Sequence, residues 1–165
     1  MKGERASIPA ADQIVCETVV RVRFHEIDAL GHVNNAAYLN YLEQAAIDHG
    51  ALVGVDVARL KEFKGVFVAR EHHVEFLRPS FAGDVLRIFT WLEEPTGAVV
   101  VRRYLIYRRG GRDAPTPLHG WLVKFGAAPE RCDLVVSAST SWAFVSEGGM
   151  PKRIPAAVMD AFRER

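Results

Sequence analysis

The chain has 165 residues, of which 49% are apolar and 25% are charged, as in a soluble globular domain. This composition excludes a disordered chain, a collagen-like repeat and a small disulfide scaffold. The chain has 21 basic and 20 acidic side chains, so its net charge is +1. We therefore expect neither nucleic acid nor a membrane as a partner.

The N-terminal residues predict a leader and one strand. Residues 1–13 are expected to form a flexible leader, followed by a single domain over residues 14–165. The leader is followed by no long apolar stretch, so we expect no secretory signal and a cytoplasmic protein. Residues 15–25 alternate between apolar and polar side chains, which predicts a half-buried strand.

Two helices are expected next. Asn34 or Asn35 stands where an N-cap belongs, and Gly50 is placed to end the helix that follows. This helix is apolar around most of its circumference, so other structure should wrap it on most sides. A shorter helix is predicted from Asp56 to Phe63.

The rest of the chain predicts five further strands and a final helix. Gly and Pro separate apolar runs at residues 66–77, 85–93, 98–109, 118–128 and 140–145, and Pro155 begins a helical pattern. Short turns between the runs favour antiparallel pairing. The fold class is therefore α+β, as a single hot-dog domain in which an antiparallel sheet curls around the long central helix.

One carboxylate, that of Asp28, precedes the start of the long helix. The first N–H groups of a helix have no partner within it, and together with the helix dipole they favour negative charge. A carbonyl oxygen that becomes an oxyanion would be stabilised there, by about 2.7 to 4 kcal/mol for each preorganised donor. Together with a positioned general base, such donors suffice for acyl transfer from an activated ester.

The same residues carry a family resemblance. The pattern D-x-x-G-H-V-N-N-x-x-Y-L-x-x-L-E, from Asp28 to Glu43, resembles the active-site turn of the 4-hydroxybenzoyl-CoA thioesterases, and most of all that of bacterial long-chain acyl-CoA thioesterases. Residues 73–84 and 153–155 support the resemblance, which covers residues 15–162. It implies hydrolysis of an acyl-CoA substrate without a cofactor.

The resemblance assigns roles to the residues of the turn. Asp28 matches the catalytic aspartate, acting as the nucleophile or as the base for water, and both alternatives stay open. Asn35 matches the position whose backbone N–H polarises the carbonyl, and Gly31 allows the tight turn. His32 and Asn34 differ from the residues of aromatic-acyl members, and we expect them to orient the turn. Acyl length and aromatic or aliphatic preference stay open.

Each of these residues also has a structural interpretation. Asp28 could bond the backbone two positions on, as aspartate does in many turns. Asn34 and Asn35 could serve only as helix caps. Tyr38 and Glu43 are candidate substrate contacts, yet they could equally be a packed aromatic and a solvated helix carboxylate. Glu43 is also the alternative base if Asp28 is not used.

Arginines and histidines give weaker signals. Arg102 and Arg103, within a group that continues with Arg108, Arg109 and Arg112, could bind the phosphates of coenzyme A, or could be a solvated strand end. Metal catalysis is not expected, because no two of the six histidines have the spacing of metal ligands on a helix and no cysteine stands beside them. The histidines are His25, His32, His49, His72, His73 and His119. Cys16 and Cys132 are expected to be buried or idle thiols.

A homodimer or homotetramer is expected, because the outer sheet face would expose apolar residues, such as Phe89 or Trp91 on one parity of the strand and Ile88 or Leu92 on the other. Two other functions stay open. One is hydrolysis of acyl-carrier-protein thioesters, and the other is a non-catalytic module that binds acyl-CoA or a protein. A dehydratase is disfavoured, since its Gly-Asp-x-Asn-Pro-x-His signature is absent from the sequence.

Overall fold

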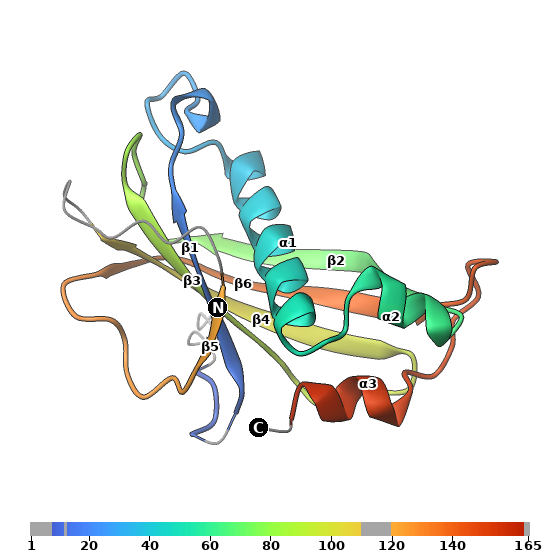
Figure 1. Ribbon diagram of the computed structural model, residues 1–165. Helices are drawn as coiled ribbons and strands as arrows, with labels where there is room; N and C mark the ends of the chain where they lie inside the picture. The colour runs from blue at the N-terminus through green and yellow to red at the C-terminus, as the bar shows by residue number, and fades with distance from the viewer. Residues whose placement is uncertain (1–7, 12, 110–119, 164–165) are drawn as a thin grey trace, which may run out of the picture.

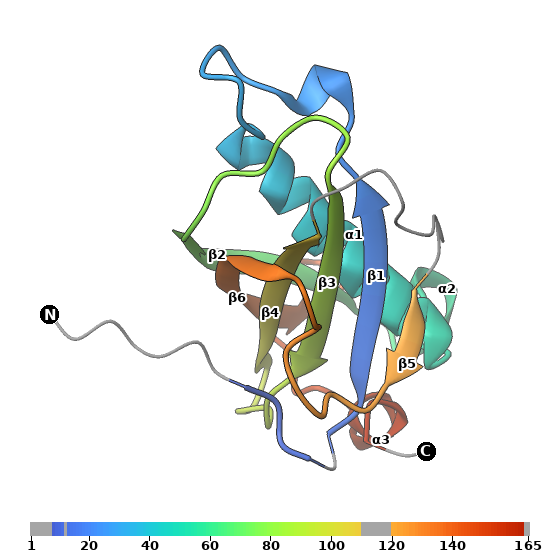
Figure 2. The ribbon, with the colours of Figure 1, turned by 90° about the vertical axis from the view of Figure 1, so that its left-hand side faces the viewer.

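A computed structural model describes residues 8–11, 13–109 and 120–163. Within these ranges six strands form one antiparallel sheet in the order β2-β6-β4-β3-β1-β5, and α1 lies across one face of it (Figures 1 and 2). The elements are β1 Val15–Arg21, η1 Phe24–Glu26, α1 Asn35–Leu52, α2 Val57–Glu62, β2 Val66–Phe76, β3 Val85–Leu92, β4 Val99–Arg109, β5 Trp121–Val123, β6 Asp133–Val145 and α3 Ala156–Ala161. The α+β hot-dog prediction is confirmed.

The main core lies between α1 and the inner face of the sheet. Leu42 and Ala45 of α1 are buried against Ile88, Ile106 and other inner-face side chains. The opposite side of α1 is open, because Ile47 remains 58% exposed. The prediction that other structure wraps most of the helix therefore holds for one side only within a single chain.

The predicted end of α1 at Gly50 is wrong by two residues. Gly50 is buried within the helix, where a Cβ would lie 2.8 Å from the carbonyl oxygen of Val55. The chain turns at Gly54, whose φ of +76° suits glycine, and the amide of Val55 donates back to the Gly50 carbonyl at 2.7 Å. Gly50 thus permits a close approach of the chain and does not end the helix.

Three strand predictions also change. Of the strand expected over residues 118–128, only Trp121–Val123 is a strand within the described residues. Residues 15–25 end as a strand at Arg21, and residues 24–26 form the short 3₁₀ turn η1. The strand expected over residues 140–145 begins earlier, at Asp133. Its first half contains Asp133 and Ala138, residue types that are depleted in strands, and it pairs on both sides with β2 and β4.

The outer face of the sheet is partly covered by the chain itself. Phe89 and Trp91 are buried with Phe125, which follows β5, and the Phe89 and Phe125 rings meet edge to face at 5.0 Å. A second subunit is therefore not needed to cover these two side chains. Some predicted features lie outside the described residues: most of the expected leader (residues 1–7), Arg112, and the start of the strand expected over residues 118–128, which includes His119.

An uncovered edge remains at β2. Within the described ranges β2 pairs only with β6, and most of its side chains are exposed. Val68 is 42% exposed on this edge. A long unpaired edge is a place where a second chain can add.

Candidate active site

The Asp28 turn closes on itself through the backbone. The amide of Asp28 donates to the His32 carbonyl at 2.8 Å, and the amide of Gly31 donates to the Asp28 carbonyl at 3.0 Å. Gly31 has a φ of +79°, a conformation that other residues adopt only with strain. The sequence predicted this role of the glycine.

The carboxylate of Asp28 is only partly engaged. Its Oδ1 accepts from the amide of Leu30 at 2.8 Å and from that of His32 at 3.3 Å. No hydrogen bond reaches Oδ2 from any residue that the structure describes. One oxygen of Asp28 therefore holds the turn through backbone hydrogen bonds, and the other has no hydrogen-bond donor among the described residues.

The two asparagines at the start of α1 have different tasks. Asn34 is the N-cap, and its Oδ1 accepts from the amide of Ala36 at 2.8 Å. The amide of Asn35, the first residue of the helix, has no acceptor within the described ranges. The cap leaves this one N–H open, at the position where the resemblance requires a carbonyl polariser.

The loop between β2 and β3 packs against the turn. The amide of Val33 donates to the Ser80 carbonyl at 2.9 Å, and the rings of His32 and Phe81 meet edge to face at 5.4 Å. Ser80 and Phe81 belong to the second segment of the family resemblance. The fold thus brings together two motifs that are distant in the sequence, and it gives His32 a packing contact.

Glu26 and Tyr41 link the turn to α1, and sequence analysis missed both. The Tyr41 hydroxyl donates to Glu26 Oε2 at 2.7 Å, and the same oxygen accepts from the amide of Arg23 at 2.6 Å. Burial, reinforced by the Glu26 carboxylate, raises the pKa of the Tyr41 hydroxyl. No sequence pattern marks this pair, because it joins residues of different elements.

Tyr38 lies in the core next to Tyr41. Its ring packs against those of Tyr41 and Phe76, at centroid distances of 5.8 and 5.5 Å. Burial raises the pKa of its hydroxyl, while the nearby Ser80 hydroxyl acts in the opposite direction. The structure thus places Tyr38 as a packed aromatic.

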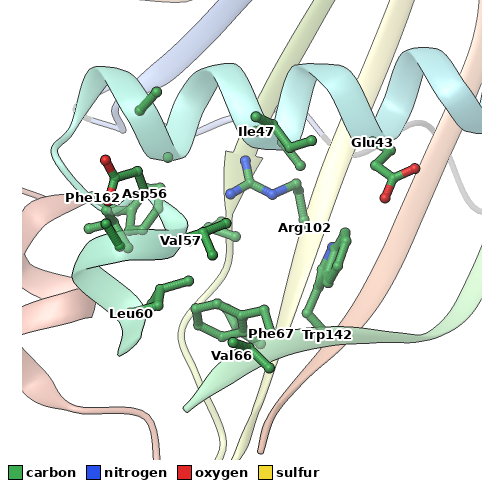
Figure 3. A pocket seen from close by; sticks show the side chains of 17 residues that line it. Glu43, Ile47, Asp56, Val57, Leu60, Val66, Phe67, Arg102, Trp142 and Phe162 are labelled. Atoms are coloured by element: carbon green, nitrogen blue, oxygen red, sulfur yellow. The ribbon is translucent and has the colours of Figure 1, made fainter. Parts of the chain in front are cut away.

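A pocket of about 500 Å³ lies along the other half of α1, bounded by α2 and the start of β2 (Figure 3). Glu43 lies at one end of it, and Asp56, the N-cap of α2, at the other. Glu43 follows Asn35 by eight residues, roughly 12 Å of helix rise. The pocket therefore lies along the second half of α1, whereas the Asp28 turn precedes its first residue.

Side chains from several elements line this pocket, and sequence analysis did not group them. Apolar side chains form most of the wall: Ala46, Ile47, Val55, Val57, Leu60, Val66, Phe67, Leu92, Val100, Trp142 and Phe162. Arg102 is the one cation among the described lining residues. The order of these residues in the chain gives no signal for the pocket, because five or more elements contribute to it.

Arg102 and Arg103 do not form one site. Arg102 faces α1, is 5% exposed, and donates through Nη1 to His49 Nδ1 at 2.9 Å and to Thr90 Oγ1 at 3.3 Å. Arg103 points to the other face, where its Nε pairs with Glu93 Oε1 at 2.6 Å. The structure thus corrects the grouping of these arginines as a joint phosphate site.

His49 is neutral in this setting. Burial, together with the charge of Arg102, lowers its pKa to about 2. Since an arginine can only donate, Nδ1 of His49 is the acceptor and Nε2 carries the proton. No acceptor for that N–H is found in the part of the chain that the structure describes.

Among the described residues, the structure shows no metal cluster, no disulfide between the two cysteines and no membrane-spanning helix. No cluster of three or more potential metal-binding side chains occurs among them. Cys16 is buried, which raises its pKa to about 11, and it is not bonded to Cys132. None of the helices is long and apolar enough to cross a membrane.

The sequence matches the model of the thioesterase-like superfamily over residues 22–162. It is also 32% identical over 82 residues to the long-chain acyl-CoA thioesterase FadM of Escherichia coli. That alignment includes 49% of this chain and spans 61% of the length of the E. coli protein.

Two solved structures share the fold. A 1,4-dihydroxy-2-naphthoyl-CoA thioesterase from Synechocystis aligns with a TM-score of 0.71 at 13% identity, over 90% of this chain and 95% of that one. A thioesterase from Thermus thermophilus, in complex with coenzyme A and zinc, aligns with a TM-score of 0.67 at 24% identity, over 90% and 91%.

Proposed function

This chain belongs to the thioesterase-like superfamily, and from that membership we propose that it hydrolyses acyl-CoA thioesters at the Asp28 turn. One observation carries the proposal. The open Oδ2 of Asp28 and the open amide of Asn35 belong to the same short turn at the start of α1. A thioester carbonyl placed there would meet a carboxylate and a hydrogen-bond donor.

The reaction needs no group beyond these residues and water. The Asn35 amide and the helix dipole hold the carbonyl oxygen as it gains negative charge. In one route Oδ2 of Asp28 attacks the carbonyl carbon, the C–S bond breaks, coenzyme A leaves as a thiolate that takes a proton, and water hydrolyses the anhydride. In the other route Asp28 takes a proton from a water molecule as the oxygen of that water attacks the carbonyl carbon, the C–S bond then breaks, and the departing thiolate of coenzyme A takes up the proton.

We also propose a homodimer that forms along the β2 edge, and a cytoplasmic location. The exposed length of β2 supports the first, because an open strand edge pairs readily with a second copy. The separate thiols of Cys16 and Cys132 support the second.

Substitution of Asp28 by asparagine tests the proposal. Asparagine keeps an oxygen for the amides of Leu30 and His32, so the turn should persist while the charge is lost. We expect kcat for thiol release from acyl-CoA to fall at least a hundredfold, the scale of a lost base or nucleophile, with an unchanged melting temperature.

Glu43→Gln is the comparison variant, because it also removes one carboxylate and tests the alternative base on α1. Full activity of Asp28→Asn together with loss of activity in Glu43→Gln would move the base to the helix. Tight acyl-CoA binding without thiol release by the wild type would favour the non-catalytic module instead.

A further inference from the structure

A lone positive charge lies in the wall of the pocket. The side chain of Arg102 is almost fully buried, and within the described ranges it forms no ion pair. Its hydrogen bonds go to the neutral acceptors of His49 and Thr90. Buried charges in proteins are normally paired, since an unpaired one loses its hydration without compensation.

The neighbouring groups do not supply the missing negative charge. His49 is neutral, and Phe162 contacts the guanidinium only through its ring face, at 5.7 Å. Of the two carboxylates that line the pocket, that of Asp56 caps α2 by accepting from the amide of Arg59 at 2.8 Å. The other, Glu43, is exposed at the far end, and no ion pair joins it to Arg102 (Figure 3).

Trp142 adds a polar group to the wall beside Arg102. It lines the pocket, and its indole N–H, which can only donate, acts on the Tyr104 hydroxyl. The pocket thus combines an apolar wall with one cation, Arg102, that has no anionic partner among the described residues.

We propose that this pocket binds the distal end of the acyl group and that this end carries an anionic oxygen group, such as a carboxylate, which pairs with Arg102. The apolar wall accommodates the carbon chain. The proposal rests on the proposed hydrolysis of acyl-CoA and specifies its substrate as an acyl group with a negatively charged far end.

Matched substrates test the proposal kinetically. Octanoyl-, dodecanoyl- and hexadecanoyl-CoA are each compared with their ω-hydroxy and ω-carboxy counterparts by thiol release. At the best chain length we expect kcat/KM to be highest for the ω-carboxy substrate and lowest for the ω-methyl one. In Arg102→Met the ratio of ω-carboxy to ω-methyl should fall at least tenfold, and Arg102→Lys should retain part of it.

Arg59→Met is the matched control. Arg59 lies on α2 beside the pocket but does not line it, and its side chain is 51% exposed. Arg59→Met removes one positive charge, as Arg102→Met does. An equal fall of the ω-carboxy to ω-methyl ratio in Arg59→Met would therefore indicate a non-specific electrostatic effect and overturn the assignment. Arg102→Met also leaves the buried Nδ1 of His49 without its donor, so thermal unfolding is recorded for each variant and the ratio between substrates is compared rather than the absolute rate.

Direct binding separates this proposal from the proposed activity. Calorimetry compares hexanoate with hexan-1-ol on the wild type and on Arg102→Met. We expect hexanoate to bind at least tenfold more tightly than the alcohol to the wild type, and this preference to disappear in the variant. Equal binding of the two, or a preference that survives Arg102→Met, overturns the anion site whether or not any thioester is hydrolysed.

Discussion

The two roles that sequence analysis treated as alternatives for Asp28 are compatible. Its Oδ1 closes the turn by accepting from two amides, and no residue in the described ranges donates to its Oδ2. The turn fixes the direction of the carboxylate, so the structural bond can serve the proposed reaction. Asp28→Ala should therefore lose both the turn and the charge, whereas Asp28→Asn separates the two effects.

His49 gives the chain a pH-dependent stability. Its pKa is about 2 in the folded chain and about 6.5 in the unfolded chain. Between these values the unfolded chain binds a proton that the folded chain does not. Stability should therefore fall as the pH falls below 6.5, by up to about 1.4 kcal/mol for each pH unit, with no such loss above it.

Melting temperatures between about pH 8 and pH 5 check this expectation. His49→Gln removes the titrating group and still offers an oxygen to Arg102. The melting temperature of the wild type should fall more steeply with acidification than that of the variant. Parallel curves for the two proteins would show that another group controls the acid sensitivity.

Among the elements, α1 depends on its first residues. Asn34 caps the helix through the Ala36 amide and keeps the Asn35 amide open. Asn34→Ala should lower the free energy of unfolding by about 1 kcal/mol, and Asn34→Ser should restore most of it, because a hydroxyl is also a good cap. Denaturant titrations measure the difference.

Activity distinguishes a cap from a substrate contact at Asn34. If capping is its only task, Asn34→Ser should hydrolyse acyl-CoA at the wild-type rate. A large loss of kcat in Asn34→Ser at unchanged stability would contradict the capping role and assign the side chain to the reaction.

Elements with strong local signals were predicted well. Asp56 begins α2 as a cap, as expected, and the apolar face of α3 with Val158 and Met159 is buried. The first half of β6 was missed because its formation depends on pairing with two neighbouring strands, β2 and β4, that are distant in the sequence.

At the scale of the whole molecule, two surfaces of the single chain stay exposed, namely one side of α1 and the edge of the sheet at β2. Ile47 and Val68 are 58% and 42% exposed on these two surfaces. We expect the wild type to sediment as a dimer or a larger oligomer. Val68→Lys should shift it to the monomer, because a charge on the edge disfavours strand pairing.

Ile8→Lys is the control for this experiment, since Ile8 is 70% exposed and lies before the sheet. It should sediment as the wild type does. A wild type that sediments as a monomer, or a Val68→Lys protein that stays a dimer, would reject the β2 interface.

The sequence by itself determined the fold class, the central helix and the Asp28 turn, because these follow from local spacing, caps and a short motif. Tertiary structure alone decided where the pocket lies and that Arg102 faces it while Arg103 does not. Strand alternation sends neighbouring side chains to opposite faces, but only packing decides which face is inside. The pocket forms where side chains from segments distant in the sequence come together, so a local sequence pattern could not predict it.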